Sequence, residues 1–203
     1  MRRKPRKGFE SSELDLTEIA PGQIWRRLYR SIYPNPLGYG LAPSRFSDPR
    51  LDRPEVARFG VLYLGSSLKV CFLETMLRDR RNGALGDVPI PFTELQRWNC
   101  ADIAVVSPLK LVDLRKDGAV RMGIPTDAVR ASAHRLGQDW ALAFWSHTET
   151  PDGIIYPSRL NEETNIALFD RAIFKVRVEA VRPLLDSRAE MADLFRTYRL
   201  AIV

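Results

Sequence analysis

Residues 60–81, GVLYLGSSLKVCFLETMLRDRR, constrain the fold most, because they join a short apolar strand to a helix that carries a glutamate. Residues 61–64 are β-branched, aromatic and aliphatic, which is typical of a buried strand. Ser66 and Ser67 supply hydroxyls that can cap a helix, and the pattern predicts that helix over residues 67–81. We therefore expect a strand followed directly by a helix at the centre of the fold.

Glu74 lies on an otherwise apolar face of that helix, since Val70 and Leu77 share the face at helical spacing. An ionised carboxylate in such a place is costly unless it is paired or hydrogen-bonded. Two interpretations follow. Glu74 is either an edge residue whose head reaches water or Arg78, or a functional acid that its surroundings hold for chemistry.

The length and composition bound the organisation of the chain. Its 203 residues with 45% hydrophobic content predict one domain with a sizeable core, over residues 21–203, after a polar, basic and loosely attached leader at residues 1–20. No apolar run approaches the ~20 residues of a membrane span, and no signal core follows the basic start, so we expect a cytoplasmic protein with no membrane contact. Two cysteines and two histidines form no disulfide framework or zinc cluster, so no metal is expected.

The formal net charge of +6 indicates an anionic partner. Arginine outnumbers lysine, and the guanidinium group is suited to a bidentate grip on phosphate. A non-catalytic nucleic-acid-binding protein is one interpretation of this charge. Against direct nucleic-acid binding, the arginines are spread along the chain, and no aromatic–basic patch or helix-turn-helix is evident.

The remaining elements predict an α+β fold: a single domain with mixed or antiparallel sheets and flanking helices. Residues 24–33 alternate arginine with apolar residues, which fits a strand lining a cleft or an exposed edge strand. A long loop with Arg45 follows at residues 34–54. Further strands are expected at residues 103–106, 111–114, 153–156, 166–169 and 172–178, and helices at residues 92–98, 127–145 and 188–199.

Common catalytic signatures are absent, including the phosphate loop, the dinucleotide glycine motif, the nucleophile elbow and the zinc-protease helix. His134 and His147 are expected to be structural or surface residues, because a lone histidine is weak evidence for chemistry. The residues alone therefore suggest only an anionic ligand that meets a carboxylate in a cleft.

The stretch VLYLGSSLKVCFLE, an arginine-bearing loop before it, and the later GIIYPSR and NIALF resemble the RES domain family over residues 24–180. The resemblance implies a fold similar to the ADP-ribosyltransferase toxins. It also implies a toxin that depletes NAD by breaking the nicotinamide–ribose bond, as a glycohydrolase or a phosphorylase. NAD would be the substrate, and no cofactor is implied.

Carried over position by position, the resemblance places five family residues on this chain. Glu74 would be catalytic together with Arg30 and Ser158, while NAD would be bound by Arg30, Arg45, Tyr63 and Ser158. The two arginines suit a diphosphate, and the carboxylate suits a sugar that develops positive charge. The loop arginine stands in a Ser-Arg-Phe-Ser context here, where the family usually has Gly-Arg-Trp-Asn.

The resemblance further implies a cognate antitoxin with a helix-turn-helix DNA-binding part that plugs the NAD cleft, and homo-oligomers within the toxin–antitoxin complex. An ADP-ribosyltransferase that modifies a macromolecule is the alternative activity within the same fold.

Overall fold

In the computed structural model, the described residues, 4–80, 83 and 85–203, form one eight-stranded sheet and a smaller two-stranded sheet. The large sheet has the order β1-β6-β7-β8-β3-β2-β5-β9, and its pairs are antiparallel except for the parallel pair of β6 and β7. The small sheet pairs β4 with β10 in parallel. The strands are β1 Leu16–Ile19, β2 Ile24–Arg30, β3 Val61–Gly65, β4 Val88–Ile90, β5 Trp98–Val105, β6 Leu109–Asp113, β7 Gly153–Pro157, β8 Thr164–Phe169, β9 Val176–Pro183 and β10 Leu200–Ile202.

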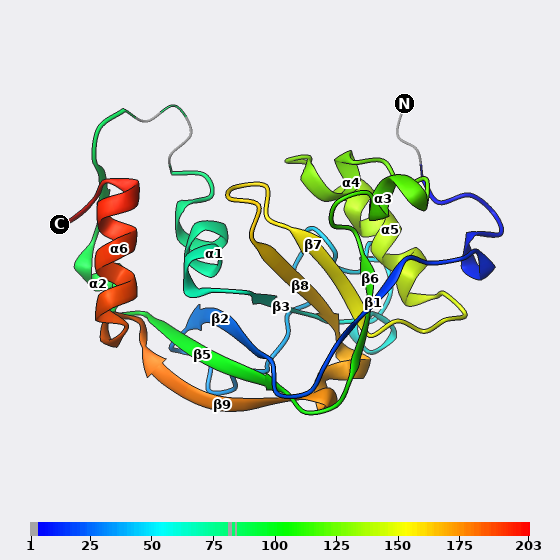
Figure 1. Ribbon diagram of the computed structural model, residues 1–203, viewed down its shortest axis with the longest axis horizontal. Coiled ribbons are helices and arrows are strands. Elements are labelled where there is room, and N and C mark those ends of the chain that lie inside the picture. The colour runs from blue at the N-terminus through cyan, green and yellow to red at the C-terminus, as the bar shows by residue number, and fades with distance from the viewer. Residues whose placement is uncertain (1–3, 81–82, 84) are drawn as a thin grey trace.

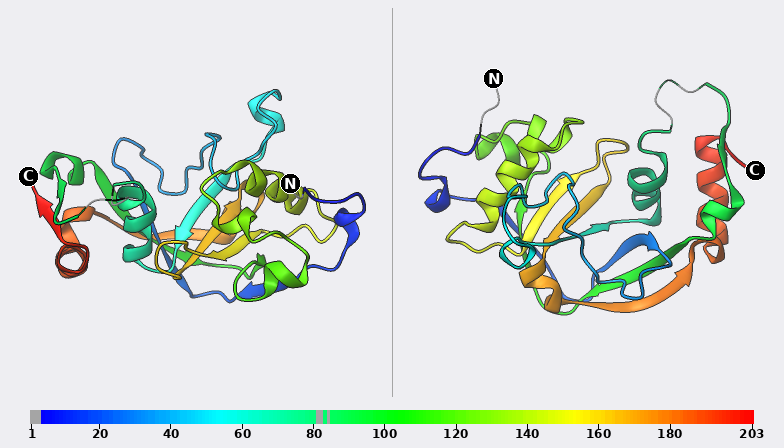
Figure 2. Two further views of the ribbon diagram at one scale, coloured as in Figure 1. Left: turned by 90° about the horizontal axis from the view of Figure 1, so that it is seen from above. Right: turned by 180° about the vertical axis from the view of Figure 1, so that it is seen from behind.

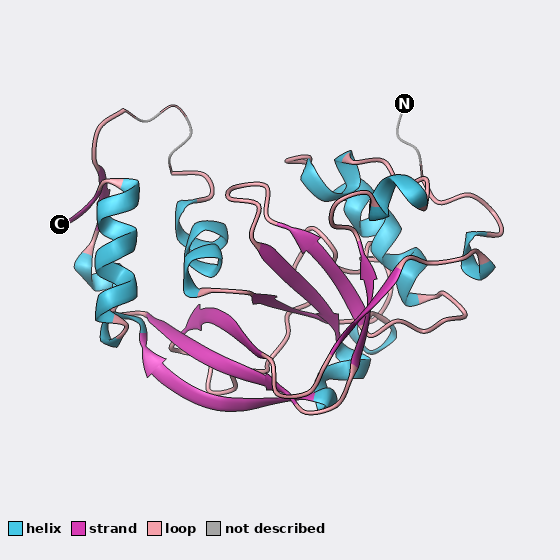
Figure 3. Cartoon of the chain, viewed as in Figure 1, coloured by secondary structure: helices cyan, strands magenta, loops and turns pink. Residues whose placement is uncertain are grey.

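The helices form two groups, with the β7–β8 hairpin between them (Figure 1). One group contains α1 and α6, and the other contains α3, α4 and α5, while the strands curve beneath both (Figure 3). The helices are α1 Leu68–Phe72, α2 Phe92–Leu95, α3 Gly118–Arg121, α4 Asp127–Arg130, α5 Arg135–Trp145 and α6 Arg188–Tyr198, with 3-10 turns at Phe9–Ser11, Glu55–Ala57, Asp170–Lys175 and Leu184–Asp186. The predicted α+β fold with a mixed sheet is confirmed.

Each helix group has its own apolar core. Trp140 and Phe144 of α5 pack with buried residues of β3, β7 and β8, so this helix covers one half of the large sheet. Phe72 of α1 and Leu194 of α6 pack with Leu28 of β2 in a second cluster. The site described below lies between these two clusters, since it is lined by Tyr156 of the first and by Leu28 and Cys71 of the second.

The helix after β3 begins as predicted but ends sooner. Ser67 is its N-cap, since the side-chain oxygen accepts a hydrogen bond from Val70 N at 3.1 Å. Regular α-helix extends only over α1, and the π-helical segment η3, Leu73–Leu77, follows it. The helix predicted over residues 67–81 is therefore confirmed from Leu68 to Leu77, although its second part is π-helical. Residues 78–80 form turns instead, and the last predicted residue lies outside the described residues.

Four other elements differ from the prediction. The helix expected over residues 92–98 ends at Leu95, and the strand expected over residues 103–106 already begins at Trp98 as β5. The helix expected over residues 127–145 is broken into α4 and α5, with Ala131 in extended conformation between them. The strand expected over residues 172–178 begins only at Val176, because Asp170–Lys175 form 3-10 turns. The last two cases put a tight turn inside a continuous apolar pattern, and apolar periodicity alone does not report such a turn.

β2 is an interior strand, so the alternative of an exposed edge strand is wrong. It pairs with β3 at a single register position, Arg26 opposite Gly65, and with β5 along its full length. Beyond that position β2 and β3 have no further register pair, which opens the sheet beside α1. In the rear view of Figure 2, the long loop after β2, drawn blue to cyan, runs in front of the sheet.

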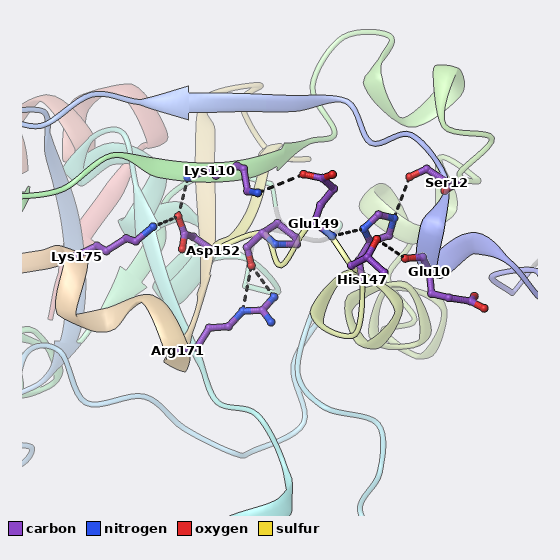
Figure 4. A network of polar contacts seen from close by, with 10 residues as sticks. Glu10, Ser12, Lys110, His147, Glu149, Asp152, Arg171 and Lys175 are labelled. Carbon is purple, nitrogen blue, oxygen red and sulfur yellow. Dashed lines mark hydrogen bonds and ion pairs between the residues drawn. The ribbon is translucent and has the colours of Figure 1, made fainter.

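The N-terminal segment differs from the expected loose leader. β1 pairs with β6 over Leu16–Ile19, and the Phe9 ring lies 4.9 Å from the Trp140 ring in an edge-to-face arrangement. His147 Nε2 lies 3.1 Å from Ser12 O, and its Nδ1 accepts from Glu149 N (Figure 4). Because Nδ1 accepts, Nε2 carries the proton and donates, so the structural role predicted for His147 is confirmed.

Candidate active site

A cavity of about 340 Å³ lies where β3, η3 and the loop around residue 45 meet. Its walls come from segments far apart in the sequence, including Leu28 of β2. The polar residues that line it are Ser44, Arg45, Tyr63, Glu74, Thr75, Arg78, Tyr156 and Asn165. Three of the five residues singled out from the sequence, Arg45, Tyr63 and Glu74, thus line one cavity.

Ser158 completes the acidic end of this cavity. Its hydroxyl donates a hydrogen bond of 2.8 Å to Glu74 Oε1, across 84 positions of sequence. Ser158 is fully buried and Glu74 is half-buried. Within the described part of the chain, Oε2 of Glu74 has no hydrogen-bond partner. The carboxylate is therefore fixed through one oxygen, and the other is available to a ligand.

The hairpin between β7 and β8 holds Ser158 in this position. The Ser158 hydroxyl also accepts from Leu160 N at 3.1 Å, and Ser158 N donates to Glu163 O at 2.6 Å. Glu163 in turn binds Ser67, the cap of α1, and forms an ion pair of 2.5 Å with Lys69. The same contacts thus join the hairpin to the helix that carries Glu74.

Tyr63 fixes the loop that carries Arg45. Its hydroxyl lies 2.9 Å from Ser44 Oγ and accepts from Phe46 N at 2.9 Å. Burial raises the pKa of the Tyr63 phenol, so the group stays neutral and keeps its proton for hydrogen bonding. In the free protein the Tyr63 hydroxyl thus holds the loop in place by hydrogen bonds, and the residue also lines the cavity.

Arg45 is largely buried and is held from two sides. Its Nη1 donates to Ala131 O at 2.6 Å, in the break between α4 and α5. Its carbonyl oxygen lies close to Gly137, where the Cβ of any larger residue would come within 2.6 Å of it. Burial is the main cause that lowers the pKa of the Arg45 guanidinium, and the neighbouring charges of Arg78 and Arg159 also lower it.

Arg78 adds a second guanidinium to the cavity wall. Its Nη2 lies 2.6 Å from His134 Nε2 at the start of α5. Because an arginine only donates, the ring nitrogen accepts, and His134 is neutral in this arrangement. Burial, together with the charges of Arg78, Arg45 and Arg159, lowers the pKa of His134. His134 therefore contacts a lining residue of the cavity, which sequence reasoning missed.

Arg30 is not among the residues that line the cavity. It ends β2, is exposed, and its guanidinium lies 4.7 Å from the centre of the Trp98 ring, directly across the strand pair. Arg27, on the same strand, donates to Pro36 O and lines a different cavity of about 360 Å³ with Tyr29, Tyr33 and Tyr39. Burial lowers the pKa of the Arg27 guanidinium to about 10.

Sequence reasoning also missed Asn165 and Tyr156, which line the cavity from β8 and β7. Tyr156 belongs to the motif GIIYPSR and Asn165 to the motif NIALF. These two motifs were therefore the sequence signal that could have identified both residues. Tyr156 packs edge-to-face on Phe46 at 4.9 Å, and burial raises the pKa of its phenol well above the usual value. Burial also raises the pKa of the lining thiol Cys71 to about 12, so it is no thiolate nucleophile at neutral pH.

A larger cavity of about 710 Å³ lies elsewhere, beside β6 and α3, and contains none of the predicted site residues. Its charged groups largely neutralise one another, as in the ion pairs Asp113–Arg115 and Arg130–Glu162. We therefore place the candidate active site in the cavity of about 340 Å³, whose lining includes the carboxylate of Glu74 and the guanidinium groups of Arg45 and Arg78.

Neither a metal site nor a membrane-spanning helix occurs among the described residues. No group of three or more His, Cys, Asp and Glu side chains is arranged there to hold a metal ion. Over the same residues, no helix is long and apolar enough to cross a membrane.

Comparison with known proteins identifies the family. A curated relative from Sinorhizobium fredii (strain NBRC 101917 / NGR234), named "Probable toxin y4kH", is 52% identical over 127 residues, which are 63% of this chain and 100% of the relative. The solved MbcT–MbcA toxin–antitoxin complex of M. tuberculosis contains a chain of similar fold, with a TM-score of 0.61 at 14% identity, covering 85% of this chain and 92% of that one. The family model of the RES domain matches residues 23–188, so the chain belongs to the RES domain family.

Proposed function

We propose that this chain is the toxin of a toxin–antitoxin pair and an enzyme that degrades NAD by breaking its nicotinamide–ribose bond. The observation that carries the proposal is the contact of Ser158 with Glu74, a residue of the cavity wall; it fixes one carboxylate oxygen and leaves the other without a hydrogen-bond partner among the described residues. Membership of the RES domain family, a relative named as a probable toxin and a structural neighbour from a toxin–antitoxin complex support the biological role.

The carboxylate suits the bond that breaks. When the bond between ribose C1′ and the pyridinium nitrogen breaks, both electrons go to the ring, which leaves as neutral nicotinamide. Positive charge then develops on the sugar, and a fixed anion stabilises this transition state more than the ground state. Glu74 is held by Ser158 before the substrate binds, so no reorganisation of the carboxylate is needed during the reaction.

The guanidinium groups suit the diphosphate of the same substrate. Arg45 and Arg78 both line the cavity, and forked hydrogen bonds from arginine match phosphate oxygens. The prediction that Arg30 binds NAD has no support from this geometry, because Arg30 stacks on Trp98 outside the cavity wall. We assign the second diphosphate contact to Arg78 instead.

Three acceptors are compatible with this site. Water would give ADP-ribose, inorganic phosphate would give the phosphorylated sugar, and a macromolecule would become ADP-ribosylated. In the first two cases a proton of the attacking water or phosphate passes to Glu74 or to solvent. The product, measured with NAD labelled in the adenylate part, separates the three outcomes.

Nicotinamide release from NAD by the purified protein tests the activity. We expect Glu74→Gln to lower the rate roughly 100- to 10,000-fold, because the neutral amide cannot stabilise a developing cation. Glu94→Gln is the matched control, since Glu94 lies on α2 and pairs with Arg80 outside the cavity. Equal rates for the wild type and Glu74→Gln would exclude the assigned role of Glu74.

The same pair of variants tests the biological role. Expression of the wild type alone should arrest growth and lower cellular NAD, whereas Glu74→Gln should do neither. Co-expression of the neighbouring open reading frame, as a candidate antitoxin, should restore growth. Normal growth with unchanged NAD in cells that contain folded wild-type protein would contradict the toxin role.

A further inference from the structure

Asn165 lines the cavity of Glu74 and carries a side-chain nitrogen, Nδ2, without a hydrogen-bond partner among the described residues. The residue is only 5% exposed. A buried donor that stays unpaired costs free energy, and native proteins keep few of them. A donor of this kind in the wall of an active-site cavity is explained if a ligand supplies the acceptor.

The sheet register places Asn165 at the acidic end of the cavity. Asn165 pairs with Gly65 of β3 on one side and with Tyr156 of β7 on the other. The next pair along the hairpin, Pro157 with Thr164, leads directly into Ser158, which holds Glu74. Asn165 is thus close to the carboxylate, at the end of the cavity where the reacting bond would lie.

We propose that the Asn165 amide donates a hydrogen bond to the carboxamide oxygen of the nicotinamide ring, and so selects the leaving group and orients it. This inference rests on the proposed NAD-cleaving function. A neutral donor suits this position, because the ring of bound NAD is a cation that a guanidinium would repel. The charged donors, Arg45 and Arg78, remain for the diphosphate.

The first experiment measures stability without any ligand. Asn165→Leu keeps the branched shape and the number of heavy atoms of the side chain and removes the unpaired donor, so its midpoint of denaturant unfolding should equal or exceed that of the wild type. Asn161→Asp is the control, since Asn161 also has an unpaired Nδ2 but accepts from Glu163 N through Oδ1 and does not line the cavity. A clearly lower midpoint for Asn165→Leu would show that the amide stabilises the free fold, and would overturn the proposal.

The second experiment measures selectivity for the leaving group. It compares kcat/KM for NAD with kcat/KM for the analogue whose pyridine ring lacks the carboxamide, in the wild type, Asn165→Leu and Asn161→Asp. The ratio of the two values should fall about 10- to 100-fold in Asn165→Leu and stay unchanged in Asn161→Asp. Because both substrates are the same for every protein, the difference in their intrinsic reactivity cancels when the ratios of two proteins are compared.

The outcomes separate this inference from the function on which it rests. An active wild type with the same ratio in Asn165→Leu overturns the role of Asn165 and leaves NAD cleavage intact. A wild type that releases no nicotinamide overturns the proposed function, and with it the assignment of the carboxamide as the acceptor. An active wild type, an altered ratio and an undiminished unfolding midpoint together support the inference.

Discussion

At the scale of single residues, the contact between Arg78 and His134 links the cavity wall to α5. The arginine donates to the ring nitrogen over 2.6 Å, so the contact exists only while His134 is neutral. Burial and the surrounding guanidinium groups already disfavour the charged ring, and they lower its pKa. Protonation of the ring on acidification should therefore break this contact.

The pH dependence follows from the sign of that shift. Below pH ~6.5 His134 becomes protonated in the unfolded chain, whereas in the folded protein it stays neutral to a lower pH. The unfolded state then binds more protons, so the free energy of unfolding falls as the pH decreases. In His134→Gln, which keeps an acceptor without a titrating ring, this part of the acid sensitivity should disappear. Denaturant unfolding of both proteins between pH 7.5 and 5 tests this; parallel curves would show that His134 makes no such contribution.

Four of the five candidate residues come together at the cavity, whereas the fifth, Arg30, does not line it. Glu74 and Ser158 touch, and Arg45 and Tyr63 line the same cavity. Arg30 shares its strand face with Leu28, which lines the cavity, yet the cavity ends before Arg30 and the guanidinium meets Trp98 across the strand pair. Alternation along a strand tells which face a residue occupies but not how far a cavity extends.

At the scale of elements, the π-helical segment η3 explains how Glu74 and Arg78 reach the cavity. Leu73–Leu77 follow α1 directly, and their wider turn changes the angular spacing of side chains relative to an α-helix. The predicted face of Val70, Glu74 and Leu77 assumed regular helical spacing throughout. The sequence predicted the strand, the cap and the helix start, but an inserted residue in a helical turn has no compositional signal of its own.

Gly137 of α5 makes a testable link between that helix and the arginine loop. A Cβ at this position would lie 2.6 Å from Arg45 O and 2.8 Å from Ala128 O, both of which are backbone atoms. Gly137→Ala should therefore displace the loop, lower the free energy of unfolding by about 1–3 kcal/mol, and raise KM for NAD as Arg45 moves. Denaturant unfolding and NAD kinetics measure the two effects.

Gly40→Ala is the control for Gly137→Ala, because a Cβ there meets only Ala42 N at 3.9 Å. It should leave the KM for NAD unchanged. If Gly137→Ala gave the stability and KM of the wild type, the close approach of α5 to the loop would not position Arg45.

At the scale of the whole molecule, one large sheet contains strands from both ends of the sequence, from β1 to β9. Composition and alternation predicted a single α+β domain, because they report burial along the chain. They did not predict β1, nor the parallel pair of β4 with β10, because these strands of four and three residues are too short to carry a pattern. Their place is set by partners distant in sequence, Leu109–Asp113 in the case of β1.

Truncation of a side chain tests whether the N-terminal segment is a loose leader or a part of the core, because only a core residue lowers the free energy of unfolding when it is truncated. Leu14 is 8% exposed and belongs to the core cluster of α5, whereas Val56 is 98% exposed. Leu14→Ala should lower the free energy of unfolding by about 2–4 kcal/mol, because it leaves a cavity beneath the helix. Val56→Ala should stay within about 0.5 kcal/mol of the wild type. Equal unfolding curves for the two variants would mean that residues before β1 are held no more firmly than a leader, and that the core of α5 is complete without them.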